Sequence, residues 1–311
     1  MTRTLGDLID DVAAARRGGD LTHGLDAAWE IVARFPEARA RGTFWAACLR
    51  SRQDEAAEAI ATLGAGLESG LWWTPDWLET EPDFARIRDL PAFKDVLEIS
   101  AERWVAANDG VVPEVVARAP DGAGPFPLLA VLHLGAEPAP QREAAWFPAL
   151  DHGVAVALIG SPARATSDPG SRTWGEPIRT EADVASALQR TSSLVAYDER
   201  VAFAGVSING RVAAQLALRG TPIAASGFAA IAPAPFDPGA EPLVRAAARG
   251  LKAWLVPHAD GPGAGSARAL ARDLERAGVH VRVDEVIGPP IVSQPDLSSL
   301  LAEATAFLFE T

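Results

Sequence analysis

The sequence predicts an α/β protein in which an all-helical region precedes a mostly parallel sheet with helices on both faces. Residues 1–108 show apolar residues at helical spacing and no strand-like run. From residue 109 to 311, apolar runs typical of strands alternate with amphipathic helical stretches. At 205–210 one such run leads directly into an Ala-rich helix through a turn that contains glycines and a serine. We therefore expect two domains, 1–108 and 109–311, joined near Asn108-Asp-Gly.

The N-terminal region is expected to consist of paired helices. Leu21, Leu25, Ala28 and Val32 fall on one face of a helix, and Pro36 would end it. Further amphipathic stretches predict two more helices and a last one over about 92–107. We expect no strand before residue 108. We also expect largely buried side chains for three tryptophans, Trp29, Trp45 and Trp104.

This helical pairing resembles that of tetratricopeptide-type hairpins. The segment Trp77-Leu-Glu-Thr-Glu-Pro-Asp-Phe-Ala-Arg-Ile-Arg-Asp-Leu-Pro-Ala-Phe is similar to the tail that often ends such arrays in bacteria. Helical-hairpin arrays commonly present a concave binding surface. The resemblance therefore implies a protein partner as one candidate ligand of the helical domain.

The C-terminal region alternates between strand-like and helix-like runs. It opens with a hairpin-like strand over 114–118, which turns through Pro120-Asp-Gly-Ala-Gly into the first long strand. The long strands are expected at 128–133, 154–159, 201–204, 225–231, 253–256 and 280–286. The helices are expected at 141–150, 181–196, 211–219, 242–249, 266–277 and 297–309. This alternation is typical of a mostly parallel sheet covered on both faces.

Composition and charge argue against several classes of partner. The 311 residues include 28 Lys and Arg against 41 Asp and Glu, for a net charge of −13. Nucleic acids and anionic membranes attract basic faces, so neither is expected as a partner. Cys48 is the single cysteine, which excludes an internal disulfide, and we expect it in the core of a helix. Early acidic residues and the lack of an 18-residue apolar run predict a cytoplasmic protein without a membrane span.

Residues 205–210, Gly-Val-Ser-Ile-Asn-Gly, carry the clearest chemical signal. They connect an apolar strand to an Ala-rich helix, which is the layout of a nucleophile elbow. Such a turn exposes the serine hydroxyl, here that of Ser207, and places the next backbone N–H, that of Ile208, where it stabilises an oxyanion. Ser207 is therefore expected at the tip of the turn, with backbone angles unusual for a non-glycine residue.

With this elbow, the C-terminal two-thirds resembles the α/β-hydrolase superfamily, in its branch of carboxylesterases, phospholipases and polyhydroxybutyrate depolymerases. Leu128-Leu-Ala-Val-Leu-His-Leu-Gly-Ala is similar to the strand that ends in the oxyanion segment. Tyr197-Asp-Glu-Arg-Val-Ala-Phe-Ala-Gly is similar to the lead-in to the elbow, and Leu255-Val-Pro-His-Ala-Asp-Gly to the acid-bearing strand. The resemblance implies Ser207 as the nucleophile and Asp260 as the acid of a triad. Alternatively, Asp260 is a turn residue of Asp-Gly-Pro-Gly.

The resemblance also implies an oxyanion site. Backbone N–H groups of Ile208 and of the Gly135 loop would stabilise the oxyanion. His133, in the same segment, corresponds to a histidine that is usually structural, with its ring bonded to the loop backbone. The elbow departs from the family at Asn209, where glycine is usual, although Asn tolerates unusual backbone angles well.

The histidine that would complete the triad is absent from its family position. After the last strand the chain reads Gly288-Pro-Pro-Ile-Val-Ser-Gln-Pro-Asp, and alignment on the proline places Val292 or Ile291 where the histidine is expected. Without a base the Ser207 hydroxyl stays protonated and is a weak nucleophile. His258 ends the acid strand, at the edge where open α/β sheets form their sites, and is the candidate replacement. The alternative is that His258 is a loop residue that fills the emptied space.

Two classes of function therefore remain open. The first is a serine hydrolase, an esterase of small acyl esters, in which Ser207, His258 and Asp260 are the catalytic residues. The second is a hydrolase-fold protein that has lost this chemistry and binds a ligand or a protein partner. Neither a metal nor a cofactor is expected for either function.

Overall fold

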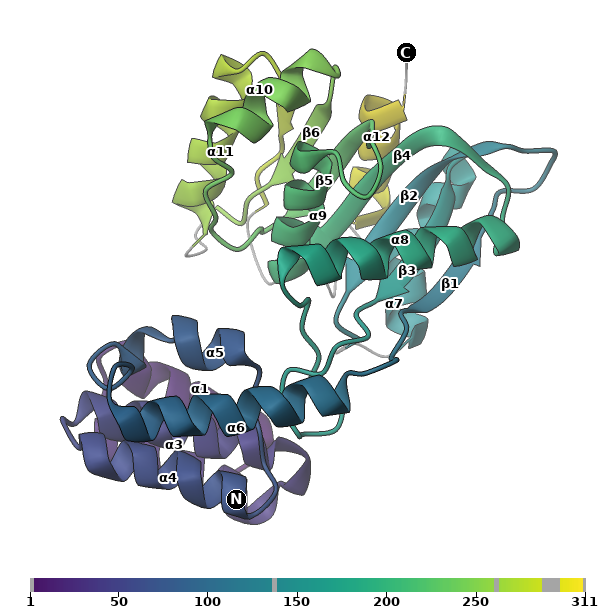
Figure 1. The fold of residues 1–311 in the computed structure, drawn as a ribbon. Helices are drawn as coiled ribbons and strands as arrows, with labels where there is room; N and C mark the ends of the chain where they lie inside the picture. The colour runs from purple at the N-terminus through teal and green to yellow at the C-terminus, as the bar shows by residue number, and fades with distance from the viewer. Residues whose placement is uncertain (1–2, 136–138, 260–262, 287–296, 310–311) are drawn as a thin grey trace. The chain divides into compact units, whose positions relative to one another are not determined.

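The structure is a computed structural model that describes residues 3–135, 139–259, 263–286 and 297–309. The chain divides into two compact units (Figure 1). The helical unit combines Met1–Val111 with Ala163–Thr173, and the sheet unit combines Val112–Pro162 with Trp174–Thr311. The helical unit therefore includes a segment that, in the sequence, lies between two strands of the sheet unit.

Consecutive helices make up the first part of the helical unit. They are α1 (Leu5–Arg16), α2 (Leu21–Arg34), η1 (Pro36–Ala38), α3 (Arg39–Arg52), α4 (Ala56–Glu68), α5 (Pro75–Thr80), η2 (Pro82–Phe84) and α6 (Pro91–Ala107). Thr4 and Asp7 form a capping box at the start of α1, and the Asp20 carboxylate accepts hydrogen bonds from N–H groups that begin α2. As predicted, the described residues up to 108 form no strand.

Two adjacent tryptophans lie in the interior of this unit, and they are not the predicted ones. Trp73 is fully buried, and its indole N–H donates to a backbone carbonyl of α3 at 2.8 Å, while Trp72 is 7% exposed. The expectation of burial was wrong for Trp29, which is 37% exposed, whereas Trp45 and Trp104 are half-buried. Helical spacing identifies which face of a helix is apolar but not how deeply the residues at the edge of that face are covered. Tryptophan is also large enough to remain partly at the surface.

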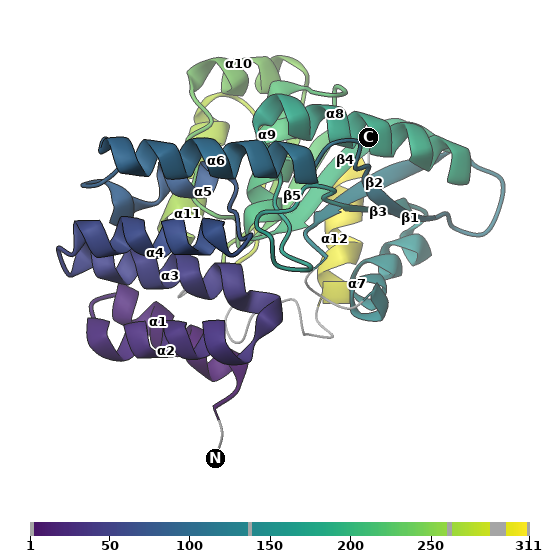
Figure 2. The same cartoon turned by 60° about the horizontal axis from the view of Figure 1, so that its bottom comes forward.

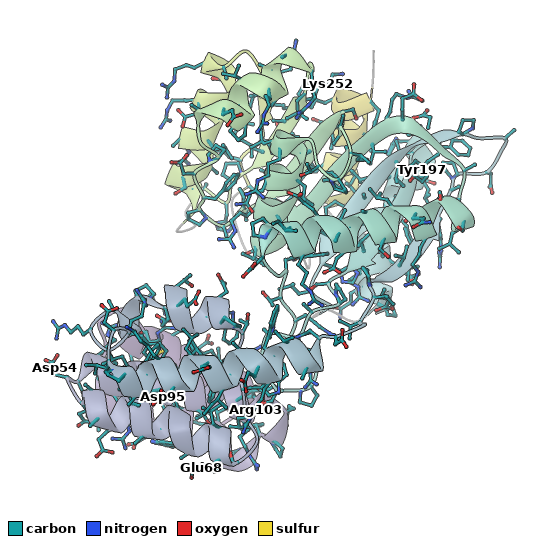
Figure 3. The ribbon with its side chains drawn as sticks, viewed as in Figure 1. Asp54, Glu68, Asp95, Arg103, Tyr197 and Lys252 are labelled. Carbon is teal, nitrogen blue, oxygen red and sulfur yellow. The ribbon has the colours of Figure 1, made fainter. Side chains whose placement is uncertain are left out.

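A side chain pairs with backbone carbonyl groups at a helix end within the same unit. Arg103, labelled in Figure 3, extends from α6, and its Nη1 donates to the carbonyl oxygens of Leu67 and Leu71 at 2.6 and 3.1 Å. Leu67 lies in the last turn of α4, where carbonyl groups have no partner within the helix. The arginine therefore ties the end of α4 to α6.

Residues Ala163–Thr173, called the held segment below, are bound among these helices. The Thr74 N–H donates to Ala165 O at 2.7 Å, and the Ser167 N–H donates to Trp72 O at 3.1 Å. The Asp168 carboxylate, 3% exposed, accepts from two N–H groups in the first turn of α3 at 2.7 and 2.9 Å. Asp168 thus caps α3, for which no neighbouring side chain does so.

A seven-stranded sheet forms the core of the sheet unit. Its strands are β1 (Glu114–Arg118), β2 (Phe126–His133), β3 (Ala155–Gly160), β4 (Tyr197–Val206), β5 (Gly227–Ile231), β6 (Lys252–Val256) and β7 (His280–Val283). They lie in the order β1-β3-β2-β4-β5-β6-β7, and only β1 is antiparallel to its neighbour. β1 pairs with β3, so the expected hairpin between β1 and β2 was wrong. β3, which is buried along its whole length, lies between β1 and β2 in the sheet.

Helices cover both faces of this sheet (Figures 1 and 2). α8 (Pro177–Leu194), α9 (Ile208–Arg219), α10 (Ala240–Ala248) and α11 (Ala264–Arg276) contribute to the hydrophobic cluster on one face. α7 (Ala139–Trp146), η3 (Phe147–His152) and α12 (Leu297–Phe309) contribute to the cluster on the other. Among the helices that the structure describes, none combines the length and the apolar character needed to cross a bilayer.

Candidate active site

The elbow between β4 and α9 has the geometry that the sequence predicts. Ser207 lies between the last residue of β4 and the first of α9, with φ of 56° and ψ of −120°, and it is exposed. Positive φ is uncommon outside glycine, and such strain costs about 1–3 kcal/mol. The prediction of a strained turn at Ser207 is therefore confirmed.

Backbone hydrogen bonds hold Ser207 in this conformation. Its N–H donates to Ile231 O, at the end of the neighbouring strand β5, at 2.8 Å. Its carbonyl oxygen accepts from the N–H groups of Arg211 and Ala234, each at 3.1 Å. One bond from α9 and two from the end of β5 and the residues after it therefore fix the turn, as a strained residue requires.

Two glycines allow the close contact between strand and helix at the elbow. A Cβ added at Gly205 would lie 2.5 Å from the backbone carbon of Asn209, and one at Gly210 would lie 2.8 Å from the carbonyl oxygen of Gly205. Backbone atoms cannot yield as a flexible side chain can, so any larger residue would displace the helix. Asn209 itself lies within α9 and has no positive φ, so its tolerance of unusual angles is not what this position uses.

Asn209 instead makes a side-chain contact that the sequence did not suggest. The Trp174 indole Nε1–H donates to Asn209 Oδ1 at 2.9 Å, and Trp174 is 8% exposed. The indole belongs to the same hydrophobic cluster as the buried part of α9. The only available signal was an amide side chain where the family usually has glycine.

The candidate oxyanion segment lies beside the elbow. β2 pairs with β4, and Leu132 is opposite Gly205, so the residues that follow both strands emerge next to one another. Gly135 is exposed and has φ of 74°, which glycine adopts without strain. The first N–H groups of α9, beginning with Ile208, have no partner within the helix and carry the positive end of its dipole. These donors suit an anionic group near Ser207.

His133 occupies an unusual environment at the end of β2. It is 7% exposed, and its ring lies against Gly160 of β3, where an added Cβ would lie 3.0 Å from His133 Cε1. Burial, together with the nearby Arg142 guanidinium, lowers the pKa of His133 from 6.5 to about 4. Its Nδ1 is buried and has no hydrogen-bond partner in the described part of the chain, where the resemblance implied a bond to the loop backbone.

A small cavity adjoins this histidine and the elbow. Its volume is about 30 Å³. The lining comes from β2, β3, α7 and the elbow: Val131, Leu132, His133, Gln141, Arg142, Ala145, Trp146, Leu158, Val206 and Asn209. The walls are mainly apolar, and polar groups lie at His133, Gln141, Arg142 and Asn209. The volume accommodates a water molecule or a very small group.

His258 lies two residues beyond β6 at the same edge of the sheet as Ser207. It is half-buried and forms an isolated parallel bridge with Val286. β5 separates β4 from β6, so the two backbones are about 10 Å apart at the usual strand spacing. Within the described residues, the Ser207 hydroxyl makes no hydrogen bond. Asp260 and the expected histidine position at Val292 or Ile291 lie outside the described residues.

The remaining histidines lie elsewhere. His280 begins β7 at the amino end of the parallel strands, and His152 is exposed at the end of η3. His23 is in the helical unit, with Nε2 at 3.4 Å from the Asp11 carboxylate. Within the sheet unit, neither His280 nor His152 is placed to activate Ser207.

One group of potential metal-ligating atoms occurs in the helical unit. Cys48 Sγ and the carboxylates of Glu81 and Asp83 lie within 4.8 Å of one another. Arg16 donates to Glu81 at 2.6 Å and to Asp83 at 2.9 Å, so both carboxylates are already paired with a cation. Cys48 is fully buried, as predicted, and burial raises the pKa of its thiol. The cluster is better explained as a structural ion pair than as a metal site.

Strand order and elbow together define the sheet unit as an α/β-hydrolase fold. Its one antiparallel strand lies at the edge, and the serine turn follows the central strand β4. No protein-family model and no curated protein sequence matches the chain.

Solved structures that resemble the chain include one that spans both units. An uncharacterised protein from Bacillus cereus matches with a TM-score of 0.48 and 17% identity, covering 99% of each chain. Est1E from Butyrivibrio proteoclasticus, with ferulic acid bound, matches with a TM-score of 0.49 and 11% identity, over 65% of this chain and 98% of that one. A fungal esterase from Rhizomucor miehei matches with a TM-score of 0.49 and 14% identity, over 63% and 77%.

Proposed function

We propose that the chain is a serine hydrolase that cleaves small carboxylic esters, with Ser207 as the nucleophile. The observation that supports this most directly is the exposed Ser207, held by three backbone bonds in a strained conformation between β4 and α9. Strain of this kind persists where the surrounding structure maintains it and is concentrated at functional sites. A protein without use for the serine hydroxyl would gain stability from glycine at this position.

In the proposed reaction the Ser207 oxygen attacks the ester carbonyl carbon. The Ser207 proton passes to the base, and the carbonyl oxygen becomes an anion that accepts hydrogen bonds from the N–H groups of Ile208 and Gly135. The carbon–oxygen bond to the alcohol then breaks, and the alcohol leaves with the proton from the base. Water, deprotonated by the same base, releases the acid and regenerates Ser207.

His258 is the proposed base, with Asp260 as the carboxylate behind it. His258 follows β6 on the correct edge of the sheet, and the backbone separation of about 10 Å is within the combined reach of two side chains. His133 is the less suitable base, because a pKa of about 4 gives little drive for proton transfer at neutral pH. Its place at the end of β2 fits a supporting role in the oxyanion segment.

A fluorophosphonate probe tests this proposal without knowledge of the natural ester. Such probes phosphonylate an activated serine, so wild-type protein should be labelled stoichiometrically and Ser207→Ala should not. Labelling should be lost in His258→Ala and retained in His133→Ala if His258 is the base. Labelling that is unaffected by both histidine variants would overturn the assignment of the base, and no labelling of the wild type would overturn the proposed activity.

The second candidate function is binding without catalysis. It is favoured by one observation, the lack of a hydrogen bond to the Ser207 hydroxyl within the described residues. In that case simple aryl esters should be hydrolysed hardly at all. Introducing Val292→His is then the informative reverse test, since a tenfold gain corresponds to about 1.4 kcal/mol of barrier. The tetratricopeptide-like character of the helical unit, its binding of a protein partner and the cytoplasmic location remain predictions.

A further inference from the structure

The first turn of α9 is held from outside the elbow by one side chain. Trp174 donates its indole N–H to Asn209 Oδ1 at 2.9 Å. Asn209 is the second residue after Ser207 and directly follows Ile208, whose N–H begins the helix. Since residues of one helical turn move together, a shift of Asn209 would also move the Ile208 N–H.

Little free space exists for Asn209 to move. Its backbone carbon and carbonyl oxygen face Gly205, where an added Cβ would lie at 2.5 and 2.6 Å. The strand therefore limits the turn from one side, and the indole holds the Asn209 side chain from the other. Without the indole, the Asn209 amide oxygen would lose this hydrogen bond at a half-buried position.

Trp174 is itself well anchored. Its indole is 8% exposed within the hydrophobic cluster that includes the buried side of α9. This packing within the sheet unit limits the movement of the indole.

We propose that Trp174 is a positioning residue, which acts through Asn209 to hold the Ile208 N–H in place for the oxyanion formed at Ser207. The pair would add a specific hydrogen bond to the close backbone packing between Gly205 and Asn209. This inference rests on the proposed function of Ser207, but the contact itself can be tested separately.

The kinetic test uses saturation kinetics of a fluorophosphonate probe. Trp174→Phe removes the indole N–H and keeps an aromatic ring, and Asn209→Ala removes the acceptor and keeps the Cβ. Each variant should lower the maximal inactivation rate about three- to tenfold, with the probe concentration at half-maximal rate changed less than twofold. The double variant should be no slower than the slower single variant, because the two side chains act as one unit. Multiplying losses, or a loss confined to probe affinity, would overturn the proposal.

A spectroscopic test does not depend on activity. The backbone amide resonances of Ile208 and Gly210 should shift in Trp174→Phe and stay unchanged in Trp29→Phe, a control at the surface of the helical unit. If wild-type protein is never labelled but these amides shift, the proposed activity fails and the positioning contact stands. If the amides do not shift in Trp174→Phe, the positioning role is wrong whatever the activity.

Discussion

Replacing His133 with glutamine should remove a large part of the acid sensitivity of the sheet unit. His133 is 7% exposed at the end of β2, and burial beside Arg142 lowers its pKa from 6.5 to about 4. As the pH falls below about 6.5, the unfolded chain takes up a proton at this histidine, whereas the folded chain does not until about pH 4. The contribution of neutral His133 to folding stability is therefore present in full above pH 6.5 and is lost progressively as the pH falls toward 4.

The size of the effect follows from the difference between the two pKa values. A difference of about 2.5 pH units, at 1.36 kcal/mol for each, gives a loss of about 3 kcal/mol between neutral pH and pH 4. A domain is typically stable by only about 5–15 kcal/mol, so the loss at this single histidine would be a substantial share of the total unfolding free energy. Glutamine carries no titrating group and should lack this contribution.

The measurement is the free energy of unfolding in urea at several pH values between 7.5 and 4.5. The wild type should lose about 2.5 kcal/mol more than His133→Gln over this range. His152→Gln, which changes an exposed histidine, is the matched control and should follow the wild type. Parallel curves for wild type and His133→Gln would show that His133 is not held neutral by burial, and would refute the reasoning.

Three further changes test packing and backbone contacts within each of the two units. Asp168→Ala leaves one buried and one partly buried N–H group of α3 without an acceptor and should destabilise the helical unit by about 2–3 kcal/mol. Exposed Asp89→Ala should change the urea midpoint of unfolding little. Gly205→Ala forces a Cβ onto backbone atoms and should lower the unfolding free energy by about 1–3 kcal/mol or more. Gly265→Ala, whose Cβ would meet no atom within 4 Å, should be neutral or slightly stabilising. Equal melting temperatures of these two variants would contradict this. Ser207→Gly should raise the unfolding free energy by about 1 kcal/mol and abolish probe labelling, and a loss of stability would show that Ser207 is not strained.

Much of the sheet could be predicted because its inner strands are buried on both faces. β3 is buried along its whole length and therefore reads as a continuous apolar run, as parallel strands do. The elbow was predictable for a related reason, since glycines at 205 and 210 are needed where strand and helix backbones touch. At β3 and at the two elbow glycines, the residue types themselves therefore indicate the local structure.

Other features depend on contacts between distant parts of the chain. Nothing in the sequence pattern indicated that the held segment folds among the helices, because its binding consists of backbone bonds and of a carboxylate that caps a helix more than a hundred residues earlier. The pairing of β1 with β3 was missed for the same reason, since nearness in sequence favoured a hairpin. The burial of Trp72 and Trp73, which contact the held segment and α3, could not be read from helical spacing.

The sequence by itself determined the order of helices and strands and the strained serine turn, because these follow from local periodicity and from glycine at close contacts. Only the tertiary structure decided that Trp174 meets Asn209 and that His133 is buried beside Arg142. A hydrogen bond between residues 35 positions apart and a pKa lowered by burial both depend on how the layers pack. Packing depends on the whole chain, so no local pattern contains it.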